Sequence, residues 1–151
     1  MKKLEVKVTH LIDNWDCDDC GCTMEEGWKV VSPTHPELDV TMTPSAFCYD
    51  GEGYTVGDLI KHWMSKGITP TGINVSELPF HDYEFLPLVV PEAFKDTTYM
   101  LDGEEFTDHE QQICDTGLIQ EFLSKVYKLP VNLLTSSKDI STNFNEELEV
   151  F

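Results

Sequence analysis

The residues best suited to chemistry gather in one short stretch, residues 15–28. Three of the five cysteines lie there, and we call Cys17, Cys20 and Cys22 the cysteine cluster. Because two residues separate Cys17 from Cys20 and Gly21 follows, both thiolates could reach one tetrahedral ion over a tight turn. This spacing is typical of one half of a zinc knuckle.

A structural zinc site needs four ligands, and the cysteine cluster supplies at most three. The fourth would come from Cys48, or else from His35 or Cys114. The metal hypothesis therefore names Cys17, Cys20, Cys22 and Cys48 as zinc ligands. A second Cys-x-x-Cys pair is missing from the sequence, so a solvated acidic loop with reduced thiols is the competing interpretation.

The same stretch is rich in carboxylates and has a tryptophan at each end. Charge mostly steers an association and buried aromatic side chains hold it, so this combination indicates a surface for contact with another protein. Two glutamates at the tip of a second expected hairpin could extend that surface. The predicted partner-binding residues are Trp15, Asp16, Asp18, Asp19, Glu25, Glu26, Trp28, Glu104 and Glu105.

The charge composition narrows the class of partner. The chain has 151 residues and a formal net charge of −18, from 28 acidic and 10 basic residues, all of them lysine. Without arginine the chain lacks the side chain best suited to clamping a phosphate, and a polyanion would be repelled. We therefore expect no direct binding to nucleic acid and a partner with a basic surface.

The motifs of common enzymes are absent from the sequence. It has no Gly-rich phosphate loop, no Gly-x-Ser-x-Gly elbow and no His-Glu-x-x-His. Cys48 with His35 or His62 could act as nucleophile and base, so a small enzyme or ligand-binding protein is one alternative. The lack of arginine and the presence of only two alanines would also follow from an AT-rich genome, such as that of many phages.

These observations favour a small acidic cytoplasmic binding protein, of the kind that phages use as inhibitors or decoys. It would occupy the basic, nucleic-acid-binding surface of a host protein. A zinc-stabilised protein-interaction module is the first alternative. A charge that only prevents aggregation is the simplest competing explanation of the acidity.

Hydrophobic periodicity predicts the elements that position these residues. Residues 4–12 alternate between apolar and polar side chains, as a half-buried strand does, and residues 28–31 form a second short strand. The cysteine-rich stretch is therefore expected to be the tip that joins two strands. Residues 38–42 and 46–49 are expected to add further strands.

Two helices follow from three-and-four spacing of apolar residues. One covers about residues 56–66 and ends at Gly67, which supplies a left-handed stop. The other covers about residues 108–128, after a capping box that begins at Thr107. Between them, the prolines of residues 68–96 predict no helix, with extended segments at residues 83–86 and 88–90.

The remaining segments complete an α+β fold. We expect a hairpin over residues 99–106, a strand at residues 131–134, a polar loop at residues 135–145 and a closing strand at residues 147–151. No segment is long and apolar enough to span a membrane. The sequence predicts one compact acidic domain over residues 1–151, with a mostly antiparallel sheet and two or three helices packed on one face.

Overall fold

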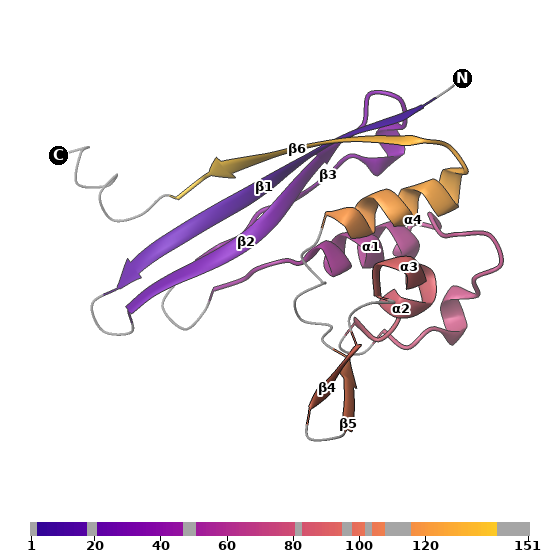
Figure 1. Cartoon of the computed structure of the whole chain (residues 1–151). Coiled ribbons are helices and arrows are strands. Elements are labelled where there is room, and N and C mark those ends of the chain that lie inside the picture. Colours follow the sequence, from indigo (N-terminus) through magenta and orange to yellow (C-terminus); the bar gives the residue numbers. More distant parts are fainter. Residues whose placement is uncertain are drawn as a thin grey trace. The chain divides into compact units, whose positions relative to one another are not determined.

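The computed structural model describes residues 3–17, 21–46, 51–80, 83–94, 98–101, 104–107 and 116–141. Its fold is α+β, as the sequence predicts. The chain forms two compact units, labelled by element in Figure 1. The sheet unit contains residues 5–55 and the residues from 133 onward, and the helical unit contains residues 1–4 and 56–132. The division into two compact units does not decide whether the chain folds as the one domain that the sequence predicts, so that remains a prediction.

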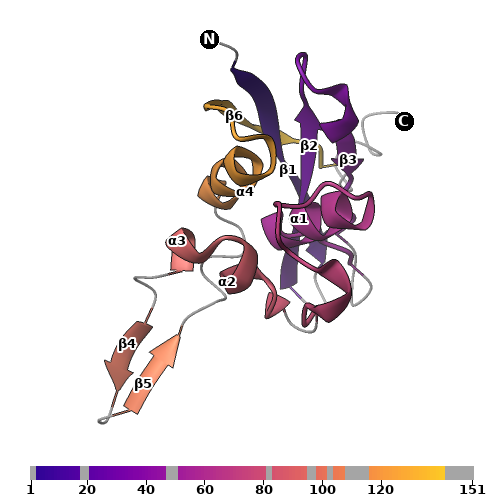
Figure 2. The same ribbon diagram turned by 90° about the vertical axis from the view of Figure 1, so that its right-hand side faces the viewer.

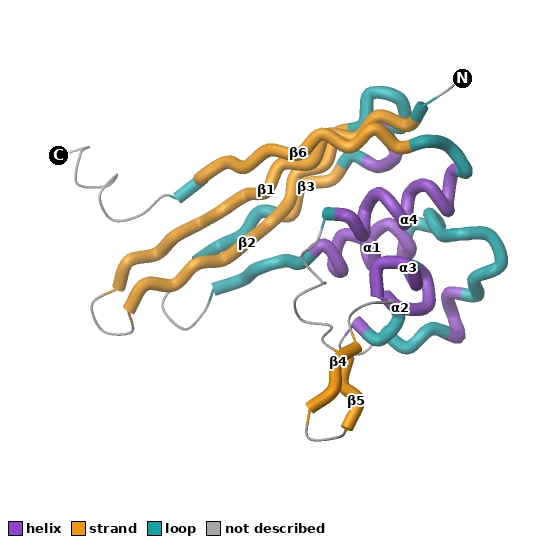
Figure 3. Tube along the Cα trace, in the orientation of Figure 1, coloured by secondary structure: helices purple, strands orange, loops and turns teal. Residues whose placement is uncertain are grey.

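Four strands form a mixed, mostly antiparallel sheet in the order β3-β2-β1-β6 (Figure 3). Their bounds are Leu4–Cys17 for β1, Gly21–Val31 for β2, Val40–Met42 for β3 and Val131–Asp139 for β6. β2 is antiparallel to both β1 and β3. β6 runs parallel to β1, because Pro130 accepts a hydrogen bond from Leu4 and Ile140 donates one to Ile12.

Alternation along β1 explains why this segment is a strand. Val6 and Val8 are buried, whereas Glu5 and Lys7 are exposed. Since side chains alternate between the two faces of a strand, one face of β1 is apolar and the other meets water. The register places Val8 opposite Val30, which is also buried, so cross-strand apolar pairs stabilise the sheet.

Gly27 allows the chain after β3 to cross β2. A Cβ atom at this position would lie 2.1 Å from the carbonyl oxygen of Met42 and 2.4 Å from Cδ of Pro44. Only glycine leaves room for such a close approach of two backbones. The segment then continues to an isolated antiparallel bridge between Ser45 and Glu52. This crossing holds residues 43–46 and 51–55 close to β2 (Figure 3).

The helical unit is built on α1, Val56–Ser65, and α4, Gly117–Tyr127 (Figure 2). Trp63 of α1 stacks on Phe122 of α4, with ring centroids 6.1 Å apart and both side chains fully buried. The structure confirms the first predicted helix within one residue, and Gly67 has the expected left-handed φ of 88°. In the second prediction, residues 108–115 lie outside the described residues, and the helix ends at Tyr127 as expected.

The prediction that residues 68–96 contain no helix is wrong. Short helices α2, Leu86–Val89, and α3, Pro91–Phe94, replace the extended segments expected there, and η2, Val75–Glu77, is a 3₁₀ turn. Pro91 stands at the first position of α3 and Pro87 at the second of α2. The first-turn amides of a helix need no helical partner, so proline is tolerated there.

The other strand predictions are largely confirmed. β4, Thr98–Leu101, pairs with β5, Glu104–Thr107, as the expected hairpin. Residues 38–42 divide into a 3₁₀ turn, η1, Pro36–Leu38, and β3. The polar loop predicted from residue 135 is wrong for residues 135–139, which belong to β6. Pairing with β1 satisfies this backbone although its side chains are polar. Residues 47–49, 142–145 and 147–151 lie outside the described residues.

Candidate functional site

The β1–β2 hairpin carries the residues that the sequence singles out. Its eleven register pairs run from Lys7↔Val31 to Cys17↔Gly21, so the strands extend further into the cysteine-rich stretch than predicted. The stretch lies where two strands meet, as expected, but the expected loop is wrong for residues 15–17 and 21–28, which belong to β1 and β2. Three residues, 18–20, connect the strands and lie outside the described residues.

Charge is segregated along this hairpin. Lys7 and Lys29 lie at the end of the hairpin that is farthest from residues 18–20. Lys7 lies opposite Val31 there, and Lys29 lies opposite Thr9. Between these two lysines the sequence contains no basic residue except His10. All the carboxylates of the hairpin beyond His10 fall towards the other end, which we call the acidic end. Its carboxylates are Asp13, Asp16, Asp18, Asp19, Glu25 and Glu26.

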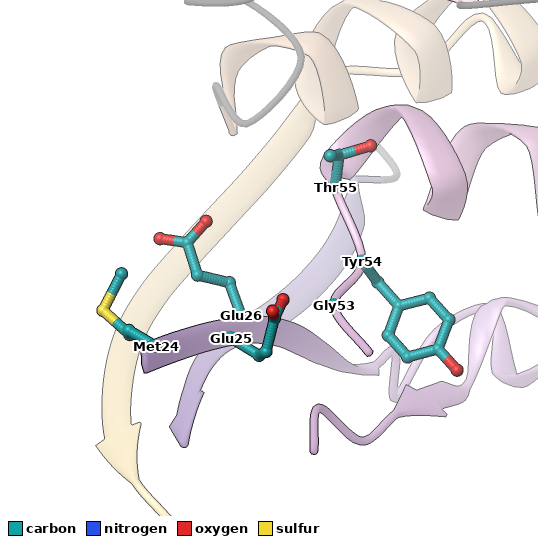
Figure 4. A pocket seen from close by; sticks show the side chains of 6 residues that line it. All are labelled: Met24, Glu25, Glu26, Gly53, Tyr54 and Thr55. Carbon is teal, nitrogen blue, oxygen red and sulfur yellow. The ribbon is translucent and has the colours of Figure 1, made fainter. Parts of the chain in front are cut away.

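Asp13 and Glu25 face each other across the two strands of the acidic end. Asp13 Oδ2 accepts a hydrogen bond of 2.9 Å from the backbone N–H of Ala46. The Glu25 carboxylate lies against the backbone of Gly51 and Gly53, where an added Cβ at Gly53 would come within 2.2 Å of Oε2 (Figure 4). Like charges directly opposite each other destabilise a sheet, so repulsion within this pair offsets part of the stabilisation that the Asp13–Ala46 hydrogen bond provides.

The other face of the hairpin holds His10, Glu26 and Trp28. The His10 ring stacks on Trp28 with centroids 4.6 Å apart, and its Nε2 lies 3.2 Å from Glu26 Oε1. His10 Nε2 makes no hydrogen bond to a described residue, so its contact with Glu26 is an ion pair only when the imidazole is protonated. Trp28 is 2% exposed and donates its indole N–H to the Tyr54 carbonyl oxygen.

This burial changes the interpretation of Trp28. The sequence suggests an aromatic anchor for a partner, but the side chain belongs to the core of the sheet unit. Met24 is 53% exposed and is the large apolar side chain that the described part of the acidic end offers to solvent. Sequence reasoning missed Met24 and Asp13, because their positions on the faces depend on strands longer than the alternation indicated.

A shallow hollow of about 310 Å³ lies beside the acidic end (Figure 4). It is lined by Met24, Glu25 and Glu26 of β2 and by residues 53–55. The Tyr54 N–H donates to the Glu26 carbonyl oxygen at 2.7 Å, and this hydrogen bond holds residues 53–55 against β2. Two carboxylates and one exposed methionine make this hollow suited to a cationic side chain with an aliphatic stem.

The remaining predicted residues are distributed as follows. Trp15, Asp16 and Cys17 occupy positions of β1, and Cys22 lies opposite Asp16 on β2. Glu104 and Glu105 lie in β5 of the helical unit, opposite Leu101 and Met100. Asp18, Asp19, Cys20, Cys48 and the alternative ligand Cys114 lie outside the described residues.

The zinc hypothesis stays a prediction. Within the described ranges, no group of three His, Cys, Asp or Glu side chains could hold a metal ion. The side chains of the four named ligands, Cys17, Cys20, Cys22 and Cys48, lie outside what the structure describes. The alternative ligand His35 has its Nδ1 2.8 Å from the Thr34 hydroxyl.

Comparisons with known proteins identify no relative of this chain. No family model matches it, and neither a curated protein nor a solved structure matches it. Among the residues described, no helix is long and apolar enough to cross a membrane.

Proposed function

We propose that this chain is an acidic binding protein that occupies a basic surface of another protein, and that the acidic end makes the contact. The observation that carries the proposal is the segregation of charge along the hairpin, with Lys7 and Lys29 beside Glu5 at one end and carboxylates without any lysine at the other. A charge that serves only solubility acts through its total and needs no such segregation.

The Asp13–Glu25 pair supports the same proposal. Two carboxylates opposite each other oppose folding, and neither side chain is needed to fill the apolar core. Residues that reduce stability in this way are often kept for a function. A cationic partner would remove the repulsion on binding, so part of the binding free energy would come from relieving it.

The spacing of the carboxylates supports a partner groove built for nucleic acid. Counted over both faces, the register places Asp13, Asp16, Glu25 and Glu26 within four steps along the strands, which is about 13 Å. That is one charge per ~3.3 Å, close to the ~3.4 Å of one nucleic-acid strand and sparser than the ~1.7 Å of a DNA duplex. A groove that neutralises phosphates could therefore accept this end as a decoy.

Apolar contact would come from Met24 and Trp15 rather than from Trp28. Met24 is exposed, and the thioether of methionine adapts to irregular surfaces. Trp15 lies on β1, opposite Thr23. The buried Trp28 instead supports the strand that presents Glu26.

Capture from a host extract, followed by kinetics, tests this proposal. Proteins retained by the immobilised chain are identified and purified, and their association rates are measured from low to high salt. Neutralising Asp16, Asp18 and Asp19 together as Asn should slow association by about tenfold or more at low salt, since steering depends on local charge. DNA should compete for the same partner.

A matched variant separates local from total charge. The triple change Glu5→Gln, Glu37→Gln and Asp39→Asn removes the same number of charges from exposed positions of the sheet unit, at the end of the hairpin that holds Lys7. This control should leave the association rate within about twofold, because charges beyond about a Debye length are screened. Equal slowing by both variants, or a partner that binds DNA and this chain together, would show that the acidic end is not a decoy.

A further inference from the structure

The strand at one edge of the sheet, β6, has an outer side that no strand of the described chain covers. Its inner side is fixed to β1 by the hydrogen bonds at Pro130 and Ile140 and by a 3.2 Å contact between the hydroxyls of Thr9 and Ser136. The strand is nine residues long, which is enough to pair with a full strand of another chain.

The direction of the backbone groups follows from these contacts. Pro130 and Ile140 direct their groups to β1, and alternate residues of a strand point their N–H and C=O groups to the same side. The odd-numbered residues therefore point outward. Val131 agrees with this alternation, since its carbonyl oxygen accepts a bond from the Gln120 side chain at 3.2 Å instead of from β1. The outward groups that continue the edge belong to Leu133, Thr135, Ser137 and Asp139.

The usual protection of an edge strand is weak along β6. Natural edges are shielded by proline, bulges, charged side chains or very short length. Residues 131–139 contain no proline and a single lysine, Lys138. Residues 134–139 are exposed in succession, and Leu134 is 53% exposed. The opposite edge strand, β3, has only three residues, so β6 is the edge that could accept another strand.

The charges around β6 decide between the occupants. A second copy of the chain would bring another net charge of −18, which opposes self-association. The end of β6 lies at the acidic end, because Asn14 donates its backbone N–H to the Ser141 hydroxyl at 2.8 Å. Asp139 and Asp13 are therefore both close to this end of the strand. They favour a partner segment whose cationic residues lie beside Asp139.

We propose that β6 accepts an extended, cationic segment of the partner protein as a fifth strand of the sheet. This inference rests on the proposed function and adds the mode of binding. Antiparallel pairing is the more stable arrangement, and a segment antiparallel to β6 has its N-terminal residues beside Asp139. The segment therefore carries its lysines or arginines at its N-terminal end, followed by β-branched residues that pair with Thr135 and Ser137.

Synthetic peptides test this mode with the full-length chain. The first probe has three lysines followed by alternating threonine and valine, the second has the lysines at the C-terminal end, and the third replaces lysine by glutamate. The first should bind at least about tenfold more tightly than the other two. In ¹⁵N spectra it should slow amide exchange at Thr135 and Ser137, whose N–H groups point outward, more than at Ser136.

Proline substitution tests the hydrogen bonds themselves. Ser137→Pro removes one outward N–H, a change that an edge strand tolerates, and Ser137→Ala is the matched control that keeps it. The proline variant should weaken the first peptide by about tenfold or more, and the alanine variant by less than about threefold. Unchanged protection of the β1 amides verifies that the sheet of the proline variant is intact.

The outcomes separate this inference from the proposed function. If the first peptide binds with shifts confined to the acidic end and equally well to Ser137→Pro, strand addition is wrong while the proposed function stands. If binding depends on Ser137 but is unchanged when Asp16, Asp18 and Asp19 are neutralised, the edge binds peptides and the acidic decoy is wrong. Concentration-dependent protection of Thr135 without any peptide would show that a second copy is the occupant.

Discussion

Replacing Glu25 by glutamine should stabilise the hairpin and weaken its binding to a basic partner. Glu25 lies directly opposite Asp13, and the Cβ atoms of such pairs are about 5 Å apart. Two like charges at this distance repel by about 0.8 kcal/mol in water, which is an upper value for this pair because Asp13 bonds to Ala46 and Glu25 lies beside Gly53. With a Debye length of about 8 Å at 0.15 M salt, roughly 0.4 kcal/mol of this repulsion remains. Glu25→Gln keeps the shape of the side chain and removes the repulsion.

The free energy of unfolding should therefore rise by about 0.4 kcal/mol at 0.15 M salt, and by about 0.7 kcal/mol at 0.01 M, where the Debye length is ~30 Å. At 1 M salt the gain should fall below about 0.2 kcal/mol. Urea unfolding at the three salt concentrations measures it, and amide exchange along β1 locates it in the sheet unit. A gain of 0.4 kcal/mol moves the urea midpoint by roughly 0.1–0.4 M.

Glu5→Gln is the control on the same strand. Glu5 is exposed and lies two residues from Lys7 on one face of β1, so its neutralisation removes an attraction and should not stabilise. The reasoning is refuted if Glu25→Gln lowers the free energy of unfolding, or raises it equally at all salt concentrations. A stabilising change that leaves the association rate with the captured partner unaltered would remove Glu25 from the binding surface.

Three further predictions concern the sheet unit and the cysteine cluster. Gly27→Ala should lower the free energy of unfolding by about 2–3 kcal/mol in urea titrations, because its Cβ would meet the backbone of Met42. Gly72 has a φ of 90° and open space around it, so Gly72→Ala should lower the free energy of unfolding by only about 1–2 kcal/mol, through backbone strain. The Ser141 hydroxyl, with its backbone N–H, lowers the pKa of Asp139. Since the pKa of Asp139 is lower in the folded chain than in the unfolded chain, its stabilisation is present above about pH 4 and is lost as the pH falls through the folded value. Asp139→Asn should therefore lower the free energy of unfolding at pH 7 and leave it unchanged at about pH 2. If the cysteine cluster holds zinc, elemental analysis of protein purified without chelator should give close to one equivalent of zinc, and a chelator should destabilise the β1–β2 hairpin. Less than about a tenth of an equivalent of zinc, with all thiols titratable, would refute the zinc hypothesis.

Local pattern was sufficient for the strongly periodic elements. α1 follows from apolar residues at three-and-four spacing and from Gly67, both of which act within one or two turns of the helix. β1 follows from the alternation that begins at Leu4. The net charge of −18 is likewise a property of the sequence alone, and with it the expectation of a basic partner.

The pairing of β6 with β1 could not be predicted from the local sequence pattern. Residues 135–139 are polar and resemble a loop, but they form β6 because β1 offers its edge at a distance of more than a hundred residues along the chain. Backbone hydrogen bonds stabilise such a strand whatever its side chains are. The short helices α2 and α3 were missed for a related reason, since proline prevents a helix only in its interior and the first turn of each accommodates it.

The residues of the candidate site divide in the same way. Sequence alone indicated that the carboxylates near the cysteine cluster form one acidic stretch between two strands. Only the register paired Asp13 with Glu25, because a shift of one residue would place every side chain on the opposite face. Only packing could show that Trp28 is buried while Met24 is exposed, since the burial of a strand residue depends on what covers its face, and that is decided by segments distant in the sequence.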